Sequence, residues 1–388
     1  MPVYLDHAAT TPILPEALAA FTDALRTVGN PSSIHSAGQH ARMLLEDGRA
    51  RVAASLGADP VEVVFTSGGT ESINLAVKGL FWARQRDRRR PRIVVPAGEH
   101  HATVDTVDWL ERHEGAVVDV VPLDAQGRVD LAALEARLAA ADDVALVTFL
   151  WANNEVGTIQ PVERIVALAH DAGVPVHSDA VAAYGQVPVD FAASGLDALS
   201  VSAHKIGGPV GVGALVLGRR AVVEPLIHGG GQQRQVRSGT QDAPAAAAFG
   251  VAAATPHADV RHLRDRLVAG VRSAVPTAVL MGGPGRPAPG QRALHLPRLR
   301  GGDSLLFLLD AAGVAVSTGS ACQAGVPEAS HVLLAMGLSE DDARGALRIT
   351  LGHTSTDDDV DAFLAALPAA VARAGAAGMA SREPSLGR

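Results

Sequence analysis

The chain has 388 residues, 47% of them hydrophobic, and a formal net charge of −8 at pH 7. This length is enough for two domains with a large core, and the acidic balance gives no general basis for binding nucleic acid or an anionic membrane. A single cysteine excludes an internal disulfide and a cysteine-based zinc site, which is typical of a reducing cytosol.

Neither targeting nor membrane insertion is indicated by the sequence. The start, MPVYLDHAATTP, lacks the basic and apolar regions of a signal peptide. No apolar run approaches the about 18–20 residues that cross a membrane. The nearest run, residues 243–254, is Ala-rich and is predicted to form a buried helix. We therefore expect a soluble cytoplasmic protein.

Short runs rich in β-branched residues alternate with helical segments over the first two thirds of the chain. Helices are expected at 71–85 and at 161–173, where Pro161 begins the helix and Gly173 follows its end. The predicted strands are 61–66, 92–95, 144–149, 174–178, 197–202 and 212–218. This alternation predicts an α/β fold, in which helices cover a mostly parallel sheet.

The pattern changes after about residue 258. A long helix is predicted at 261–274, a Gly- and Pro-rich stretch follows at 282–290, and separate strand and helix signals come after it. The tail from about residue 375 has no periodicity and is expected to be disordered. The predicted domains are a large α/β domain, residues 13–258, and a smaller α+β domain, residues 1–12 and 259–388.

Three segments at the carboxyl ends of predicted strands carry polar residues that apolar packing does not explain. Ligands bind at this edge of an open parallel sheet. The Gly-rich turn at 66–72 brings backbone amides and the Thr70 hydroxyl to a helix N-terminus, where they form an anion cradle. A tight turn alone explains these glycines equally well. Asp179 ends a second strand, and Lys205 follows a third.

A phosphate cradle, a carboxylate and a lysine at one sheet edge suit pyridoxal phosphate (PLP). In PLP enzymes a lysine forms the Schiff base, a carboxylate keeps the pyridine nitrogen protonated, and a cradle holds the phosphate. The chain has only two lysines, and Lys78 lies within a predicted helix, where a surface lysine is the plain interpretation. Lys205 is therefore the predicted Schiff-base residue.

Ten segments, in one order over nearly the whole chain, carry a resemblance to a known family. They are YLDHAATTP (4–12), GNPSSIH (29–35), FTSGGTESINLAVKG (65–79), EHHA (99–102), ANNEVGTIQP (152–161), HSDAV (177–181), SAHKIGGPVGVGAL (202–215), HGGGQ with RSGT (228–240), STGSAC (317–322) and LRITLG (347–352). The chain resembles the cysteine desulfurases, which are fold-type I PLP enzymes of the class V aminotransferase group.

The resemblance implies a seven-stranded, mostly parallel sheet, a smaller α+β domain and a homodimer that takes sulfur from L-cysteine and leaves L-alanine. Lys205 would form the aldimine and act as base at the substrate Cα, Asp179 would bind the pyridinium nitrogen, and His100 would stack on the ring as a possible acid–base group. Asn154 and Arg348 would bind the substrate carboxylate, since the arginine fork matches two oxygens. The residues implied to hold the cofactor also include Gly69, Thr70, Asn154, Ser202 and His204, with Thr240 reaching it from the partner subunit.

Cys322 lies in the loop sequence VSTGSACQAGV, among Gly, Ser and Ala. An exposed unpaired thiol is a liability unless its reactivity is used, and the alternative is a chance small residue in a turn. The resemblance implies that Cys322 is the sulfur acceptor, whose thiolate attacks the substrate sulfur and carries away a persulfide. An iron–sulfur scaffold or a sulfur carrier would receive that sulfur.

One position departs from the family pattern. Two residues beyond the alanine of HxDA the family usually has a glutamine, which hydrogen-bonds the phenolic oxygen of PLP, whereas this chain has Ala182. The resemblance therefore leaves two further hypotheses open. One is another PLP lyase or transaminase, such as a selenocysteine lyase, and the other is a weakened homologue that serves as a binding subunit.

Two other patterns have plainer interpretations than the functional ones. The run RQRDRRRPR (84–92) is typical of an Arg-rich helix C-terminus, which the helix dipole favours, more than of a nucleic-acid site. The fifteen histidines include His100 with His101 and His257 with His262, but no carboxylate or spacing indicates a metal site.

Overall fold

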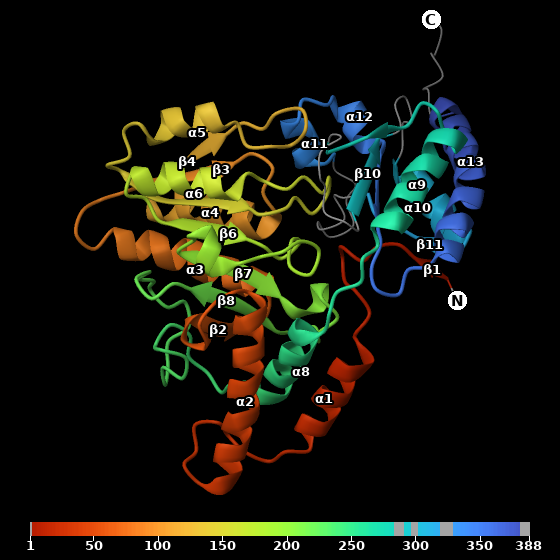
Figure 1. The fold of residues 1–388 in the computed structure, drawn as a ribbon. Coiled ribbons are helices and arrows are strands. Elements are labelled where there is room, and N and C mark those ends of the chain that lie inside the picture. The colour runs from red at the N-terminus through yellow and green to blue at the C-terminus, as the bar shows by residue number, and fades with distance from the viewer. Residues whose placement is uncertain (1, 283–290, 296–301, 319–328, 381–388) are drawn as a thin grey trace, which may run out of the picture.

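A seven-stranded sheet organises the larger part of the molecule (Figure 1). The computed structural model describes residues 2–282, 291–295, 302–318 and 329–380. The strand order is β2-β8-β7-β6-β5-β3-β4, and neighbours are parallel except where β8 meets β2 and β7. The prediction of a mostly parallel sheet is confirmed. The strands are β2 (Val63–Thr66), β3 (Arg92–Pro96), β4 (Val117–Val121), β5 (Val144–Leu150), β6 (Val176–Asp179), β7 (Ala198–Ser202) and β8 (Gly213–Leu217).

Each predicted strand of this sheet matches an observed strand to within two residues at either end. The predictions do not include β4, which lies at the edge of the sheet and is largely accessible to solvent. Its sequence VVDVV is interrupted by Asp119, whose carboxylate pairs with Arg92 and Arg137. A strand that faces solvent lacks the continuous apolar run that marks the buried strands.

Helices cover both faces of the sheet. On one face lie α3 (Gly69–Arg84) and α4 (His101–Glu114), where Ile73 and Leu110 pack in a buried cluster with Leu146. On the other face, Leu45, Ile165 and Phe149 belong to the largest buried cluster. The helices with residues in that cluster are α1 (Pro15–Leu25), α2 (Ser36–Ser55), α5 (Leu131–Leu138), α6 (Val162–Asp171), α7 (Phe191–Ser194) and α8 (Ala243–Ala254).

The helix predictions agree closely with the structure. The Ala-rich segment forms α8 with its predicted bounds, and most of its residues are buried. Pro161 is the N-cap of α6, and Gly173 follows the helix in the left-handed region, with φ of 70°. The helix predicted from residue 71 begins two residues earlier, at Gly69, so that the Gly-rich turn supplies its first residues.

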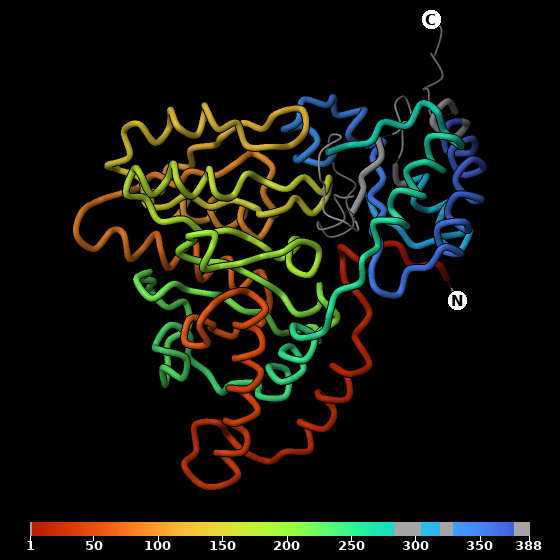
Figure 2. The backbone as a smooth tube through the Cα atoms, viewed as in Figure 1, coloured from red at the N-terminus to blue at the C-terminus, as the bar shows by residue number. Residues whose placement is uncertain are grey.

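A second buried cluster gathers the C-terminal third of the chain around Leu263, Leu347 and Phe363. The N-terminal residues join it, because β1 (Val3–Tyr4) pairs with β11 (Val314–Ala315), and Figure 2 shows this first segment among the C-terminal ones. The other elements are β9 (Val279–Leu280), β10 (Gln291–His295), β12 (Ala346–Thr350), α9 (Arg261–Ala274), α10 (Gly302–Ala311), α11 (His331–Ala335), α12 (Glu340–Arg344) and α13 (Asp357–Ala380). Strands β12, β10 and β9 form an antiparallel sheet.

One boundary prediction is wrong. The tail was expected to lose structure from about residue 375, but α13 continues to Ala380. Alanine has the highest helix propensity, and the Ala-rich segment extends a helix that is already anchored by Phe363 and Leu367. Residues 381–388 lie outside the described residues. None of the described helices is both long and apolar enough to cross a membrane.

The arginine run begins in the last residue of α3 and continues through the following loop into β3. Its side chains meet carboxylates: Arg86 pairs with Glu224 and Arg88 with Asp142. Arg90 pairs with Asp87 within the loop itself. These contacts favour a structural role for the run, although only Arg84 lies in the helix terminus that the sequence indicated.

Helices α2 and α8 cross at two glycines. A Cβ atom on Gly250 would lie 2.6 Å from the Cα of Gly48, and a Cβ on Gly48 would lie 2.3 Å from the carbonyl oxygen of Ala246. The backbones can approach this closely only because neither residue has a side chain. Figure 1 shows α1, α2 and α8 side by side, so this contact fixes the helices that cover one face of the sheet.

We expect Gly250→Ala to destabilise the protein, because overpacking at a backbone contact costs about 1–3 kcal/mol, more than the about 1 kcal/mol that alanine gains over glycine in a helix. The matched control is Gly375→Ala in α13, where no atom within 4 Å meets the new Cβ. Urea unfolding measures both variants. A Gly250→Ala protein as stable as the Gly375→Ala protein would contradict the packing argument.

Candidate active site

Three of the predicted segments meet at the carboxyl edge of the large sheet. A Cβ on Gly69 would lie 2.7 Å from Cγ2 of Val181 and 3.7 Å from Cβ of Ser202, so the Gly-rich turn lies against the ends of β6 and β7. Gly68 precedes it with φ of 153°, a conformation that favours glycine. The first turn of α3 thus presents its backbone amides and Thr70 beside Ser202, which is the arrangement of an anion cradle.

Lys205 lies in a short 3₁₀ helix, Ala203–Lys205, directly after β7. Its ammonium group donates to the carbonyl oxygens of Ala8 and Ala9, the second at 2.9 Å. The side chain also lines a cavity of about 30 Å³ together with Ala182, Gln186 and His7. The other lysine, Lys78, lies 4.0 Å above the ring of Trp109 on the helical layer, as expected for a surface lysine.

Asp179 ends β6 and is 2% exposed. Its Oδ1 accepts a hydrogen bond from the backbone N–H of Val181 at 2.9 Å. Burial raises the pKa of this carboxyl to about 6, whereas the Val181 hydrogen bond and the charge of Lys205 lower it. A buried carboxylate of this kind is stabilised by a cationic donor, such as a protonated pyridine nitrogen.

His100 is the N-cap of α4, and its Nδ1 accepts from the backbone N–H of Ala102 at 3.0 Å. Burial and, to a smaller extent, the charge of Lys205 lower the pKa of His100 to about 4, so the ring is neutral at pH 7. Because Nδ1 is an acceptor, the proton of the neutral ring is on Nε2. The imidazole can therefore donate or return one proton from that nitrogen.

His204 and Asn154 are two further predicted residues of the site. His204 hydrogen-bonds through Nδ1 to the Thr10 hydroxyl at 3.2 Å, and burial lowers its pKa to about 4. Asn154 follows β5, and its buried Oδ1 has no hydrogen-bond partner within the described residues. A buried amide oxygen without a partner is costly unless a ligand supplies one.

Arg348 on β12 approaches the same edge from the smaller part of the molecule. Its Nη1 donates to the backbone oxygen of Asn154 at 3.1 Å, and its Nη2 donates to Oδ1 of Asp6 at 2.9 Å. The buried Nε has no partner among the described residues. The contact with Asn154 brings the two predicted carboxylate-binding residues together.

The outcome differs for the remaining predicted residues. Ser317, the first residue of the STGSAC segment, pairs with Arg348 through two backbone hydrogen bonds of 3.1 and 2.6 Å, but Cys322 itself lies outside the described residues. Thr240 is exposed in the loop after β8, and no hydrogen bond in the described part of the chain joins it to the other predicted residues. An exposed position away from the other predicted residues is expected for a residue that acts in the site of a partner subunit.

The structure adds residues to the site that the sequence reasoning does not assign. The carbonyls of Ala8 and Ala9 and the carboxylate of Asp6 come from YLDHAATTP, a segment quoted only for its resemblance. Glu99, next to His100, is buried, and burial raises its pKa well above the usual range. His331 donates from Nε2 to the Glu99 carbonyl at 2.7 Å. The EHHA motif is the one signal that could have identified Glu99.

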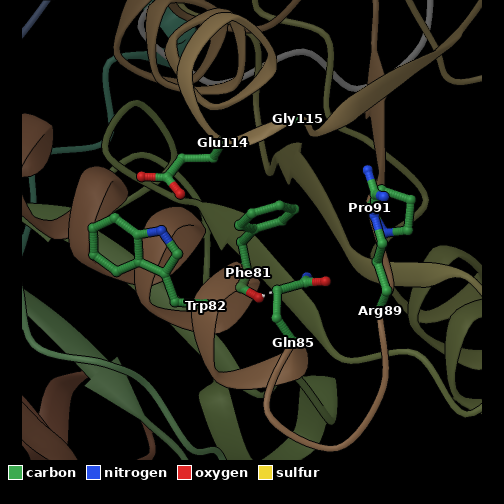
Figure 3. Close-up of a pocket in the computed structure, with 7 residues that line it drawn as sticks. All are labelled: Phe81, Trp82, Gln85, Arg89, Pro91, Glu114 and Gly115. Atoms are coloured by element: carbon green, nitrogen blue, oxygen red, sulfur yellow. Dashed lines mark hydrogen bonds between the residues drawn. The ribbon is translucent and has the colours of Figure 1, made fainter.

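A larger hollow of about 380 Å³ lies elsewhere, lined by Trp82, Arg89 and Glu114 (Figure 3). The side-chain amide of Gln85, which also lines the hollow, is already hydrogen-bonded to the backbone of Phe81 and Arg90. Glu114 ends the helix that His100 begins, about 20 Å away for 14 residues. This hollow therefore belongs to the opposite edge of the sheet and not to the candidate site.

Comparison with known proteins gives the same family as the motifs. The aminotransferase class-V family matches residues 3–363. An IscS-like cysteine desulfurase of Mycobacterium tuberculosis is 52% identical over 386 residues, which cover 97% of this chain and 98% of the relative. The cysteine desulfurase NifS of Azotobacter vinelandii is 38% identical and covers 96% of this chain and 93% of its own length.

Solved structures agree over similar lengths. A NifS-like protein superposes with a TM-score of 0.88 at 34% identity, covering 96% of this chain and all of its own. SspA, solved in complex with cysteine, superposes with a TM-score of 0.80 at 31% identity, covering 90% of this chain and 98% of its own. The chain therefore belongs to the class-V aminotransferase family and, within it, to the cysteine desulfurases.

Proposed function

We propose that this protein binds PLP through Lys205 and removes sulfur from L-cysteine, leaving L-alanine and a persulfide on Cys322. The observation that carries the proposal is the meeting of Gly69, Ser202, Asp179 and Lys205 at one sheet edge. The residues fit PLP, because burial raises the pKa of the Asp179 carboxyl, which a cationic pyridine nitrogen would stabilise, and the turn before α3 forms an anion cradle beside Ser202. When bound, PLP would supply an electron sink for the substrate Cα.

The cofactor is held by groups that match its parts. Gly69, Thr70, Ser202 and His204 would hold the phosphate, with Thr240 completing the site from the partner subunit of a homodimer. Asp179 would keep the pyridine nitrogen protonated. Asn154, whose Oδ1 is a buried polar atom without a partner among the described residues, and His100, which would stack on the ring, complete the set.

The chemistry needs a proton shuttle, an anchor and a nucleophile. The Lys205 amine would move the proton at the substrate Cα, and His100 would hold or return a proton through Nε2. Arg348 would bind the substrate carboxylate, with Asn154 beside it. The Cys322 thiolate would attack the substrate sulfur, forming an S–S bond while the C–S bond breaks and the substrate Cβ takes up a proton. Alanine leaves, and the persulfide keeps the sulfur.

The persulfide would pass to an iron–sulfur scaffold or a sulfur carrier in the cytoplasm, where a single free thiol remains reduced. No observation here favours a selenocysteine lyase or a transaminase. Ala182 supports the alternative hypothesis, a weakened homologue that serves as a binding subunit. It lines the small cavity beside Lys205, at the position where the family usually has a glutamine.

Lys205→Ala should abolish covalent attachment of PLP and sulfide release together. Lys78 is the only other amine on a side chain and lies over Trp109, so it offers no substitute. Borohydride reduction followed by peptide mapping measures the attachment, with Lys78→Ala as the matched control that keeps it. Label on Lys78 in the unmodified protein would contradict the site.

Cys322→Ser should lose nearly all sulfide release while the visible absorbance of bound PLP is retained, because the thiolate acts after the cofactor and substrate have joined. Mass spectrometry after cysteine treatment should show one added sulfur on the peptide that contains Cys322. Sulfide release at the normal rate from the serine variant would instead indicate direct elimination, as in a lyase.

Ala182→Gln should lower the pKa that governs the visible absorbance of bound PLP, because an added amide donor stabilises the deprotonated phenolic oxygen. A neutral hydrogen bond contributes about 0.5–1.5 kcal/mol, so the shift is up to about one pKa unit and turnover changes only modestly. A pH titration of the absorbance measures it, with Ala182→Val as the size control. An unchanged titration, or activity that appears only in the glutamine variant, would contradict this account and favour the binding subunit.

A further inference from the structure

The N-terminal strap, residues 4–11, contacts three residues of the candidate site. Its carbonyls at Ala8 and Ala9 accept from the Lys205 ammonium, and the Thr10 hydroxyl bonds His204. The backbone N–H of Thr11 also donates to the His204 carbonyl at 3.1 Å. The strap therefore lies against the cofactor-binding face of the site and not only against the smaller sheet.

The third contact is the ion pair between Asp6 and Arg348. Asp6 pairs in parallel with Thr350, and Arg348 lies two residues earlier on the same face of β12. Their side chains are 19% and 6% exposed, and the distance from Nη2 to Oδ1 is 2.9 Å. This geometry is set by strand register, because a shift of one residue would turn Arg348 to the other face.

The guanidinium of Arg348 is held at two of its three nitrogens. The Asp6 carboxylate accepts a hydrogen bond from Nη2, and the Asn154 carbonyl accepts one from Nη1. The buried Nε has no partner within the described ranges. With both terminal nitrogens anchored, the group cannot rotate freely about its last torsion. The Nε–H, which has no partner within the described residues, and the second N–H of each terminal nitrogen are the donors left to meet an incoming carboxylate.

Asp6 is itself rigidly placed. The Tyr4 hydroxyl donates to the carbonyl oxygens of Asp6 and Thr10, at 3.0 and 2.8 Å, and so closes the strap on itself. The backbone N–H of Ala9 donates to the Asp6 carbonyl at 3.0 Å. A group that orients a binding residue works best when its own position is fixed by such bonds.

We propose that Asp6 is a positioning residue for substrate binding: it orients the guanidinium of Arg348 so that the Nε edge receives the carboxylate of the amino-acid substrate. This inference rests on the proposed role of Arg348. It also explains why a nearly buried guanidinium is tolerated in the free protein, since the Asp6 carboxylate compensates its charge.

The test measures amino-acid binding separately from turnover. The dissociation constant of L-alanine is obtained from the change in visible absorbance of the PLP-loaded protein, and KM and kcat are measured with L-cysteine. Asp6→Ala should weaken alanine binding and raise KM by about tenfold or more, with kcat changed by less than about threefold. Asp6→Asn keeps an oxygen acceptor at the same place and should restore alanine binding to within about threefold of the unmodified protein.

A double-mutant cycle decides whether Asp6 acts through Arg348. In an Arg348→Ala background, Asp6→Ala should add no further loss of alanine affinity. The control is Asp361→Asn, which removes a carboxylate from an exposed ion pair with Arg266 and should leave both constants unchanged. If Asp6→Ala does not fold, Asp6→Glu serves instead, since it keeps the charge, shifts the acceptor by one methylene and should also weaken alanine binding.

Three results would overturn the positioning role: unchanged alanine binding in the alanine or glutamate variant, equal losses for Asp6→Ala and Asp6→Asn, or a loss that persists in the Arg348→Ala background. These outcomes are separate from those for the proposed reaction. A protein that binds alanine and responds to Asp6→Ala, yet releases no sulfide from cysteine, would refute the desulfurase chemistry and leave Asp6 as a positioning residue.

Discussion

Burial of a neutral histidine between two hydroxyls ties together the three strands on which the site depends. His177 on β6 hydrogen-bonds Thr148 on β5 through Nδ1 and Ser200 on β7 through Nε2, each at 2.9 Å. Burial lowers the pKa of His177 to about 3, so the ring stays neutral and uses one nitrogen as donor and the other as acceptor. These strands are thereby fixed in register immediately before their ends. Because Asp179 ends β6 and Lys205 follows β7, the geometry of the site is set inside the sheet.

The site also depends on the smaller part of the molecule, which reaches it through main-chain pairing. The backbone of Leu5 bonds Ala315 on β11 and accepts from Thr350 on β12, so the strap is inserted between two C-terminal strands. Lys205 and Arg348 then both contact one short segment of the chain, residues 6–9. A movement of the smaller part relative to the large sheet would displace the partners of both residues at once. The positions of Lys205 and Arg348 are therefore mechanically linked in this fold.

Local sequence patterns were sufficient for the strands that end at the site, because each is a short apolar run followed by glycine or polar residues. They predicted Asp179 and Lys205 as site residues from the sequence alone, whereas Asn154 and Arg348 were predicted from the resemblance. The pair of Asp6 and Arg348 could not be found, since 342 positions separate the two residues and neither periodicity nor capping reports on such contacts. Thr240 makes no hydrogen bond to the other predicted residues in the described part of the chain, and Cys322 lies outside the described residues. The extent of α13 was missed for a different reason, since glycines in an Ala-rich tail conceal helix propensity.

Burying a carboxyl group at the sheet edge lowers the stability of the folded protein. Burial raises the pKa of Asp179 from 3.8 to about 6, so ionising it above that pH costs the fold roughly 3 kcal/mol that an exposed carboxylate would not cost. The sign follows from a raised acidic pKa: the loss grows as pH rises from about 4 to 6 and persists at neutral pH. A cation hydrogen-bonded to the carboxylate offsets that loss, and a protonated pyridine nitrogen is such a cation. Glu99 is buried nearby, and burial raises its pKa well above the usual range, as does the charge of Asp179. The charge of Lys205 offsets part of the cost of ionising Asp179, and a positively charged ligand beside the carboxylate would offset more of it.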